Sequence, residues 1–122
     1  VQATLDAARN ADVALVGIGS LDSSSARLIE TGFVTLEQVK MLRKQGAVGD
    51  LAGRMFNRDG KDDFAHNRRV VGVTHDDLRR IPITLAAVSG PERAPAIIGA
   101  LRSGTVRVLC TDDATATEVL HA

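Results

Sequence analysis

The sequence contains no tryptophan, no tyrosine and only three phenylalanines in 122 residues. A surface that stacks the bases of single-stranded nucleic acid needs several exposed aromatic rings, so this class of binding protein is disfavoured. Lysine plus arginine and aspartate plus glutamate number 15 each, which gives a net charge of zero at pH 7. This balance removes the electrostatic basis for binding DNA or a membrane surface through the chain itself.

Cysteine is nearly absent as well. The single Cys110 cannot form an internal disulfide, which suits a reducing cytoplasm. Because it ends an apolar segment, we expect it to be a small core residue rather than a nucleophile. No apolar run approaches the roughly 20 residues of a membrane span, and the first residues lack the layout of a signal peptide. The sequence therefore predicts a cytoplasmic protein with no membrane partner.

Patterns for metal binding and nucleophilic catalysis are also missing. His66, His75 and His121 share no ligand spacing and are expected to be exposed, so no zinc site is predicted. The segment Asn57–Gly60 begins like a calcium loop, but no glutamate follows at the required spacing. No serine lies in a G-x-S-x-G elbow. The sequence thus predicts no metal, no cofactor and no catalytic residue.

What the sequence does contain is an alternation of strands and helices. An apolar segment at 83–88 precedes a glycine turn, an amphipathic helix up to Gly104, and a second apolar segment at 106–110. This is the order of a βαβ unit, and an earlier apolar run at 12–19 reads as another parallel strand. The pattern predicts an α/β fold, with a mostly parallel sheet and helices on both faces. The length and an apolar content of 44% fit one folded domain.

The remaining elements follow from local signals. Thr35 and Gln38 form a capping-box pattern at the start of a helix that ends near Lys44. Thr74 caps a further helix that runs through Arg80, because two carboxylates fall in its first turn and Pro82 ends it. We also expect helices at 2–10, 26–31 and 113–120, a helical or partly helical segment at 47–56, and a short strand at 70–73.

Two early segments carry groups that suit a hydroxyl-rich or anionic ligand. The turn containing Gly17, Gly19 and Ser20 follows a strand, and its glycines let a backbone approach a phosphate or a sugar. A third glycine is missing, which disfavours classical dinucleotide binding and leaves a plain strand-to-loop turn as the alternative. Ser24 and its serine neighbours, with Arg27, suit phosphate or sugar hydroxyls, or form a solvated loop.

Two later segments carry the same kind of chemistry. Asp50 stands among small apolar residues, and it either accepts hydrogen bonds from sugar hydroxyls or caps a helix that begins at Leu51. Gly90 lies at a helix N-terminus, where amide groups and the helix dipole favour an anion. Arg93, in the first turn, can reach that anion, or it is an ordinary surface arginine.

Taken together and in order, these motifs resemble the effector-binding domain of SorC-family sugar-responsive transcriptional regulators of bacteria. The resemblance covers nearly the whole chain, and it implies a Rossmann-like fold similar to that of sugar-phosphate isomerases and CoA transferases. It also implies a sugar or phosphorylated sugar as effector, whose binding alters the homo-oligomer and its affinity for operator DNA. The matching segments are GIGS at 17–20, the serine-rich loop, GAVGDLAGRMFNRDG at 46–60, RVVGVTHDDLRRIP at 69–82, VSGPERAPAIIGALRSG at 88–104 and VRVLCTDDATATEVL at 106–120.

The sequence departs from the family pattern in two respects. The family's helix-turn-helix and the first strand and phosphate loop of its effector domain have no counterpart here. Residues 1–122 are therefore expected to form the C-terminal portion of that domain, with operator DNA contacted only through the missing N-terminal domain. The family also commonly has lysine where this chain has Arg93, and arginine keeps the charge while adding a bidentate fork.

The resemblance further implies a role for each candidate residue. Arg27 would contact a distal phosphate or hydroxyl, and Asp50 would accept hydrogen bonds from sugar hydroxyls. Gly90 and Arg93 would flank the phosphate, and the turn at 17–20 would line the floor of the pocket.

Two other functions remain open at this stage. A sugar-phosphate isomerase-like enzyme on the same fold would use Asp50 as its base, since a fold does not fix a function. A ligand-free assembly fragment would instead pair an open edge strand with another copy of the chain.

Overall fold

The computed structural model describes residues 1–21 and 25–122, except the side chains of residues 25–27. Throughout these residues, every helix is too short or too polar to cross a lipid bilayer. The elements are α1 (Gln2–Arg9), β1 (Val13–Val16), β2 (Gly19–Ser20), α2 (Ser25–Glu30), α3 (Leu36–Lys44), β3 (Ala47–Leu51), β4 (Arg54–Asn57), α4 (His75–Arg80), β5 (Ile83–Ala87), α5 (Ala94–Arg102), β6 (Val108–Cys110) and α6 (Asp113–His121), with the 3₁₀ helices η1 (Ala65–Arg69) and η2 (Pro91–Arg93).

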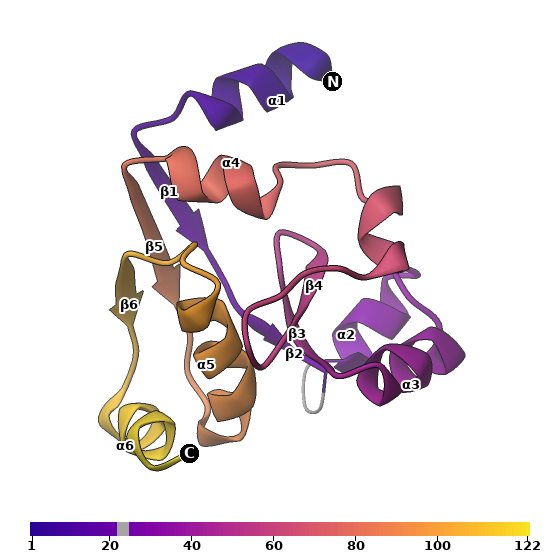
Figure 1. Cartoon of the computed structure of the whole chain (residues 1–122), viewed down its shortest axis with the longest axis vertical. Helices are drawn as coiled ribbons and strands as arrows, with labels where there is room; N and C mark the ends of the chain where they lie inside the picture. Colours follow the sequence, from indigo (N-terminus) through magenta and orange to yellow (C-terminus); the bar gives the residue numbers. More distant parts are fainter. Residues whose placement is uncertain (22–24) are drawn as a thin grey trace.

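The strands form two sheets. The first is parallel, in the order β1-β5-β6, which confirms the predicted α/β fold with parallel strands. The second is antiparallel, in the order β2-β3-β4, and the sequence did not reveal it. Helix α5 lies between the two sheets (Figure 1). Its residue Ile97 packs with Ala86 of β5 and Phe56 of β4 in one buried core.

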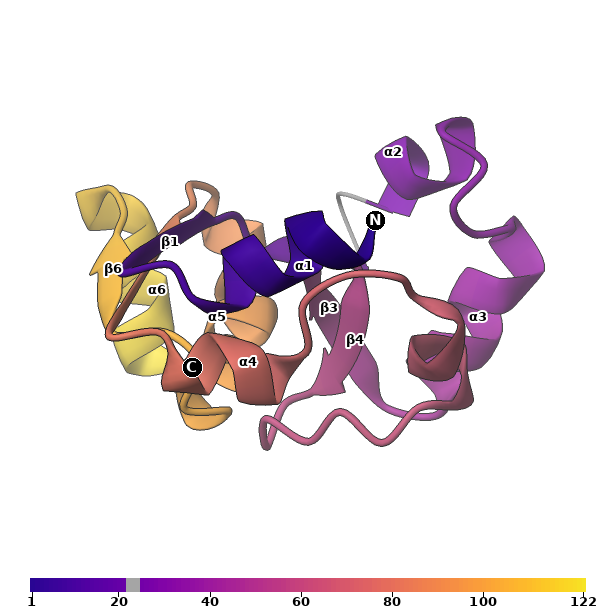
Figure 2. The same ribbon diagram turned by 90° about the horizontal axis from the view of Figure 1, so that it is seen from above.

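The two faces of the parallel sheet differ. The face with Thr84 and Ala86 is buried, and the core beneath it also receives Val119 of α6. The opposite face is open to solvent: Leu15 is 74% exposed, and neighbouring Ile83 and Val108 are also exposed. Within the described residues, helices therefore cover this sheet on one face only (Figure 2). Cys110 ends β6 on the open face and is exposed, so its prediction as a core residue was wrong.

Residues 47–56 form a β-hairpin rather than a helix. Strands β3 and β4 are joined by Ala52 and Gly53, whose φ angles are 52° and 84°. Two successive residues with positive φ make the type I′ turn that matches the twist of paired strands. Asp50 lies inside β3, so the alternative in which it caps a helix is excluded.

The predicted strand at 70–73 is also absent. Three of its four carbonyl groups face the guanidinium of Arg54 instead of a neighbouring strand. Arg54 donates to the carbonyls of Asn67 at 2.8 Å, Val70 at 3.0 Å, Gly72 at 3.3 Å and Val73 at 3.1 Å. Hydrogen bonds from the Arg54 side chain thus take the place of backbone hydrogen bonds to a neighbouring strand, and they hold this segment against β4.

Two predicted helix starts are confirmed by their hydrogen bonds. Thr35 and Gln38 form a complete capping box on α3, and Thr74 and Asp77 form another on α4. Asp77 additionally accepts a hydrogen bond from Arg9 at 3.1 Å, which joins α4 to α1. These contacts lower the pKa of the Asp77 carboxyl, with the amide N–H of Thr74 as the largest cause.

We expect Asp77→Asn to destabilise the protein at pH 7 by about 1 kcal/mol, the usual value of a helix cap. Because the folded-state pKa of Asp77 is depressed, its contribution is present above pH 3.8 and is lost as the pH falls through the folded value. The difference between variant and parent should therefore shrink at pH 3. Urea unfolding at both pH values measures it. Asp76→Asn is the control, since that side chain is 73% exposed, and an equal loss there would contradict the prediction.

Candidate functional site

The loops at the carboxyl ends of the parallel strands meet at one edge of the sheet, where ligands bind in this class of fold. The hydroxyl of Ser89, after β5, donates to Asp112, after β6, and this bond is the largest cause of the lowered pKa of Asp112. The amide of Gly90 donates to Thr115 Oγ1 at 2.9 Å. The Gly90 amide is therefore already engaged within the protein, and the sequence alone did not indicate this.

Arg93 places a positive charge at this edge of the sheet, and its guanidinium makes few hydrogen bonds. Its Nη1 lies 3.4 Å from the carbonyl oxygen of Ile18, at the start of the β1–β2 connection. Its Nε is buried and makes no hydrogen bond with any described residue. The nearest carboxylate is that of Glu92, 4.0 Å from Nε, while the Arg93 side chain is only 32% exposed. A half-buried guanidinium whose Nε has no hydrogen-bond partner among the described residues is suited to an anionic ligand.

Asp50 reaches the same connection from the second sheet. It is the partner of Gly19 in the β2–β3 pair, and a Cβ on Gly19 would collide with the Asp50 carboxylate. Glycine is thus required at 19 for this side chain to lie over the strand. Burial raises the pKa of Asp50, and a hydrogen bond from the Gly53 amide and the charges of His66 and His75 oppose that rise.

The structure therefore brings together three of the predicted site residues. Gly19 and Asp50 are paired, and Arg93 contacts the residue before Gly19. Gly17 is exposed with open space around it, whereas Ser20 is only 3% exposed. Ser24 and the side chain of Arg27 lie outside the described residues, so their roles stay predictions.

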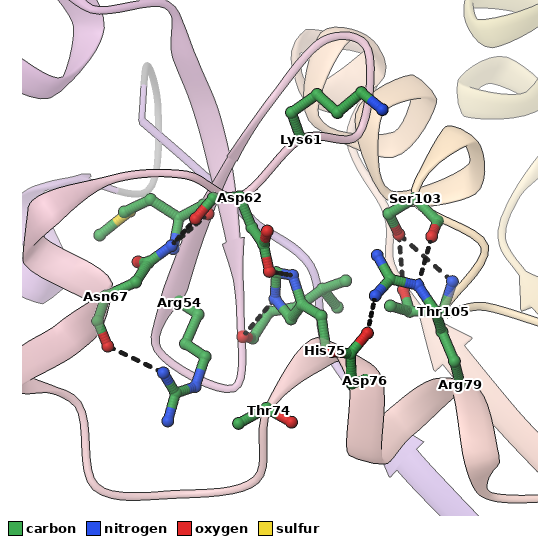
Figure 3. A network of polar contacts seen from close by, with 12 residues as sticks. Arg54, Lys61, Asp62, Asn67, Thr74, His75, Asp76, Arg79, Ser103 and Thr105 are labelled. Carbon is green, nitrogen blue, oxygen red and sulfur yellow. Dashed lines mark hydrogen bonds and ion pairs between the residues drawn. The ribbon is translucent and has the colours of Figure 1, made fainter.

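Two of the three histidines lie differently from the prediction, whereas His121 is exposed as expected. His75 is completely buried, with Nε2 3.3 Å from the Leu51 carbonyl and Nδ1 3.2 Å from Asp62 Oδ2 (Figure 3). Burial lowers its pKa, against the opposing charge of Asp62. Its spacing of three residues from buried Leu78 was the sequence signal for a core-facing position.

His66 is half-buried rather than exposed, and it packs edge-on against the ring of Phe33, with centroids 5.5 Å apart. Burial and the charge of Arg69 lower its pKa. The sequence analysis did not single out Phe33, although it is one of only three aromatic residues in the chain.

Comparison with known proteins adds a family to this geometry. The model of the family described as "Putative sugar-binding domain" matches residues 1–121. A relative named transcriptional regulator LsrR from Enterobacter sp. (strain 638) is 35% identical over 117 residues, which is 93% of this chain and 36% of the relative. LsrR from Escherichia coli (strain K12 / DH10B) is 34% identical over 127 residues, covering 100% of this chain and 39% of the relative. The chain thus spans little more than a third of these relatives.

Solved structures show the same likeness. A "Putative Sugar-Binding Domain of Transcriptional Repressor" from Vibrio fischeri is 39% identical with a TM-score of 0.88, over 98% of this chain and 48% of that one. A DeoR family transcriptional regulator from Listeria monocytogenes is 28% identical with a TM-score of 0.88, over 97% and 48%. The full-length sorbitol operon regulator SorC from Klebsiella pneumoniae, at 24% identity and a TM-score of 0.83 over 98% and 38%, shares the fold.

Proposed function

The chain belongs to a family of sugar-binding domains of transcriptional regulators, and from this premise we propose that it senses a phosphorylated sugar. The observation that supports a phosphorylated ligand is Arg93, whose Nε is buried without a hydrogen-bond partner among the described residues and whose Nη1 lies 3.4 Å from the Ile18 carbonyl oxygen. The Asp50 carboxylate lies over the next residue, Gly19, from the second sheet. The guanidinium binds the phosphate, and the carboxylate accepts hydrogen bonds from sugar hydroxyls.

In the whole protein, effector binding at this site changes homo-oligomerisation and, through it, the affinity for operator DNA. The relatives named as transcriptional regulators support this role. We assign DNA contact to a helix-turn-helix domain outside residues 1–122. The chain itself carries no net charge, which agrees with a sensing rather than a DNA-binding part. The protein acts in the cytoplasm, without a membrane partner.

We expect Arg93→Ala to weaken binding of a sugar phosphate about tenfold, or ~1.4 kcal/mol, and to leave the free sugar unaffected. Arg93→Lys keeps the charge and should retain most of the affinity. Thermal-shift screening of glucose 6-phosphate, fructose 6-phosphate and ribose 5-phosphate beside the same free sugars selects the ligand, because a compound that binds only the native state raises stability. Calorimetric titration then measures the affinities.

Arg102→Ala is the matched control, since it lies at the other end of α5 with 54% of its side chain exposed. It should bind like the parent protein. The proposal fails if none of these phosphates stabilises the parent, or if Arg93→Ala binds them as tightly as the parent does.

One observation favours the enzymatic alternative. The raised pKa of Asp50 is a property of general bases, which a sugar-phosphate isomerase would need. Incubation of the protein with the three phosphates, followed by analysis for isomeric products, tests this alternative. Turnover that disappears in Asp50→Asn would establish catalysis, and its absence would leave sensing as the role of the site.

A further inference from the structure

Two of the three phenylalanine side chains are buried in the cores, and the third is partly exposed. Phe56 is completely buried in the core around α5, and Phe64 is 7% exposed in the second core. Phe33, in the connection between α2 and α3, is 41% exposed. With no tyrosine or tryptophan in the chain, Phe33 is the one aromatic residue with a substantial part of its surface exposed.

The position of Phe33 ties it to Asp50. A Cβ added at Gly53 would lie 3.1 Å from the Phe33 Cζ atom, so the ring packs against this glycine. The amide of the same glycine acts on the Asp50 carboxylate and lowers its pKa. Gly53 therefore lies between the aromatic ring and the carboxylate, with a φ of 84° that glycine adopts without strain.

His66 completes the cluster. Its ring meets that of Phe33 edge to face, at an interplanar angle of 75°, and holds the aromatic plane in one orientation. His66 and Asp50 are close enough for each to shift the pKa of the other. Burial lowers the pKa of His66, which favours the neutral imidazole.

We propose that Phe33, supported by His66, is a specificity-determining wall of the effector site that packs against the C–H face of a cyclic sugar. This inference rests on the proposed function and deepens it. A pyranose or furanose ring presents C–H groups on one face and hydroxyls at its edge, which fits an aromatic ring beside a carboxylate. Ligand sites commonly combine apolar and aromatic walls with a few placed polar groups. An open-chain phosphate has no such ring face and gains nothing from Phe33.

The experiment compares ligands with and without a ring. We expect Phe33→Ala to weaken binding of the cyclic sugar phosphate selected by the screen about fivefold, and of glycerol 3-phosphate less than about twofold. Phe33→Trp keeps an aromatic face and should retain the cyclic ligand. Leu101→Ala is the control, because Leu101 is a similarly exposed apolar residue, at 39%, on α5. Calorimetric titration of each variant gives the affinities, and circular dichroism confirms folding.

If Phe33→Ala fails to fold, Phe33→Leu makes the same comparison, because leucine keeps the volume against Gly53 and lacks the flat ring. Equal binding of the cyclic sugar phosphate by the parent and by the non-aromatic variant overturns this inference alone. An equal loss for glycerol 3-phosphate also overturns it, since the role of Phe33 would then be structural. A parent protein that binds none of the sugar phosphates overturns the proposed function, and this inference with it.

Discussion

Replacing Gly99 by alanine is expected to destabilise the protein by about 2 kcal/mol, although alanine is the better helix former. A Cβ at Gly99 would lie 2.5 Å from the carbonyl oxygen of Asn57 and 2.8 Å from ring atoms of Phe56. Neither neighbour can move easily, because one is backbone and the other is a fully buried core ring. The steric cost therefore exceeds the gain of about 1 kcal/mol in helix propensity.

Urea unfolding followed by circular dichroism measures this effect. Gly72→Ala is the matched control, since a Cβ there would meet nothing closer than the Ala52 carbonyl oxygen at 4.0 Å. That variant should stay within about 0.5 kcal/mol of the parent protein. A Gly99→Ala protein as stable as the parent would show that α5 can move away from β4 at little cost.

The same contact positions the candidate site. Helix α5 rests on the hairpin through Gly99 and Ala96, and a Cβ on Gly49 would lie 2.8 Å from the Ala96 Cβ. The residue that precedes the helix is Arg93, whose guanidinium faces the β1–β2 connection. Asp50 follows Gly49 in β3. The close packing of helix on hairpin therefore sets the separation of the cation from the carboxylate.

The sequence correctly predicted the helices whose first residues form recognisable capping motifs. Thr35 and Thr74 each bring a hydroxyl and a partner three residues on, and both capping boxes are present. The hairpin at 47–57 was missed because its small residues are compatible with either a helix or a strand. The feature that makes it a hairpin is the positive φ of Ala52 and Gly53. Alanine rarely adopts a positive φ, so an alanine at position 52 does not predict this turn.

Other errors came from contacts between distant residues. The segment at 70–73 is rich in β-branched residues, but Arg54, at least 16 positions earlier, binds its carbonyls. Cys110 ends an apolar strand, but the sheet face that it occupies is open in the described residues. Neither contact with a distant guanidinium nor the exposure of a sheet face can be recognised from neighbouring residues. Propensity and periodicity alone therefore predicted the wrong structure for residues 70–73 and the wrong burial for Cys110.

The candidate site was predicted in part for the same reason. Asp50 and Arg93 stand out locally as charged residues beside small residues or a helix start, and the structure places both at the Ile18–Gly19 backbone. Phe33 was missed because a single aromatic residue in a polar connection carries no pattern. Only the folded chain places it against Gly53, whose amide lowers the pKa of Asp50.

We expect Asp50→Asn to have opposite effects on binding and on stability. Affinity for the sugar phosphate should fall about tenfold to a hundredfold, because hydrogen bonds to a charged acceptor are worth roughly 1.5–3 kcal/mol. The fold, in contrast, should be as stable as the parent or more stable at pH 7. Burial raises the pKa of Asp50, so the folded protein disfavours the ionised carboxylate that the variant removes.

The dependence on pH identifies this cause. With a folded-state pKa above 3.8, Asp50 favours the fold most at low pH, and this contribution is lost as the pH rises through the folded value. The stability advantage of Asp50→Asn should therefore be largest at pH 7 and should shrink towards pH 4. Urea unfolding at both pH values measures it, with Asp63→Asn as the control because that side chain is 96% exposed. A loss of stability at pH 7 in Asp50→Asn would show that Asp50 is a structural residue. Asp50 is half-buried and burial raises its pKa, so the affinity measurement on the same variant tests whether this carboxylate serves a ligand.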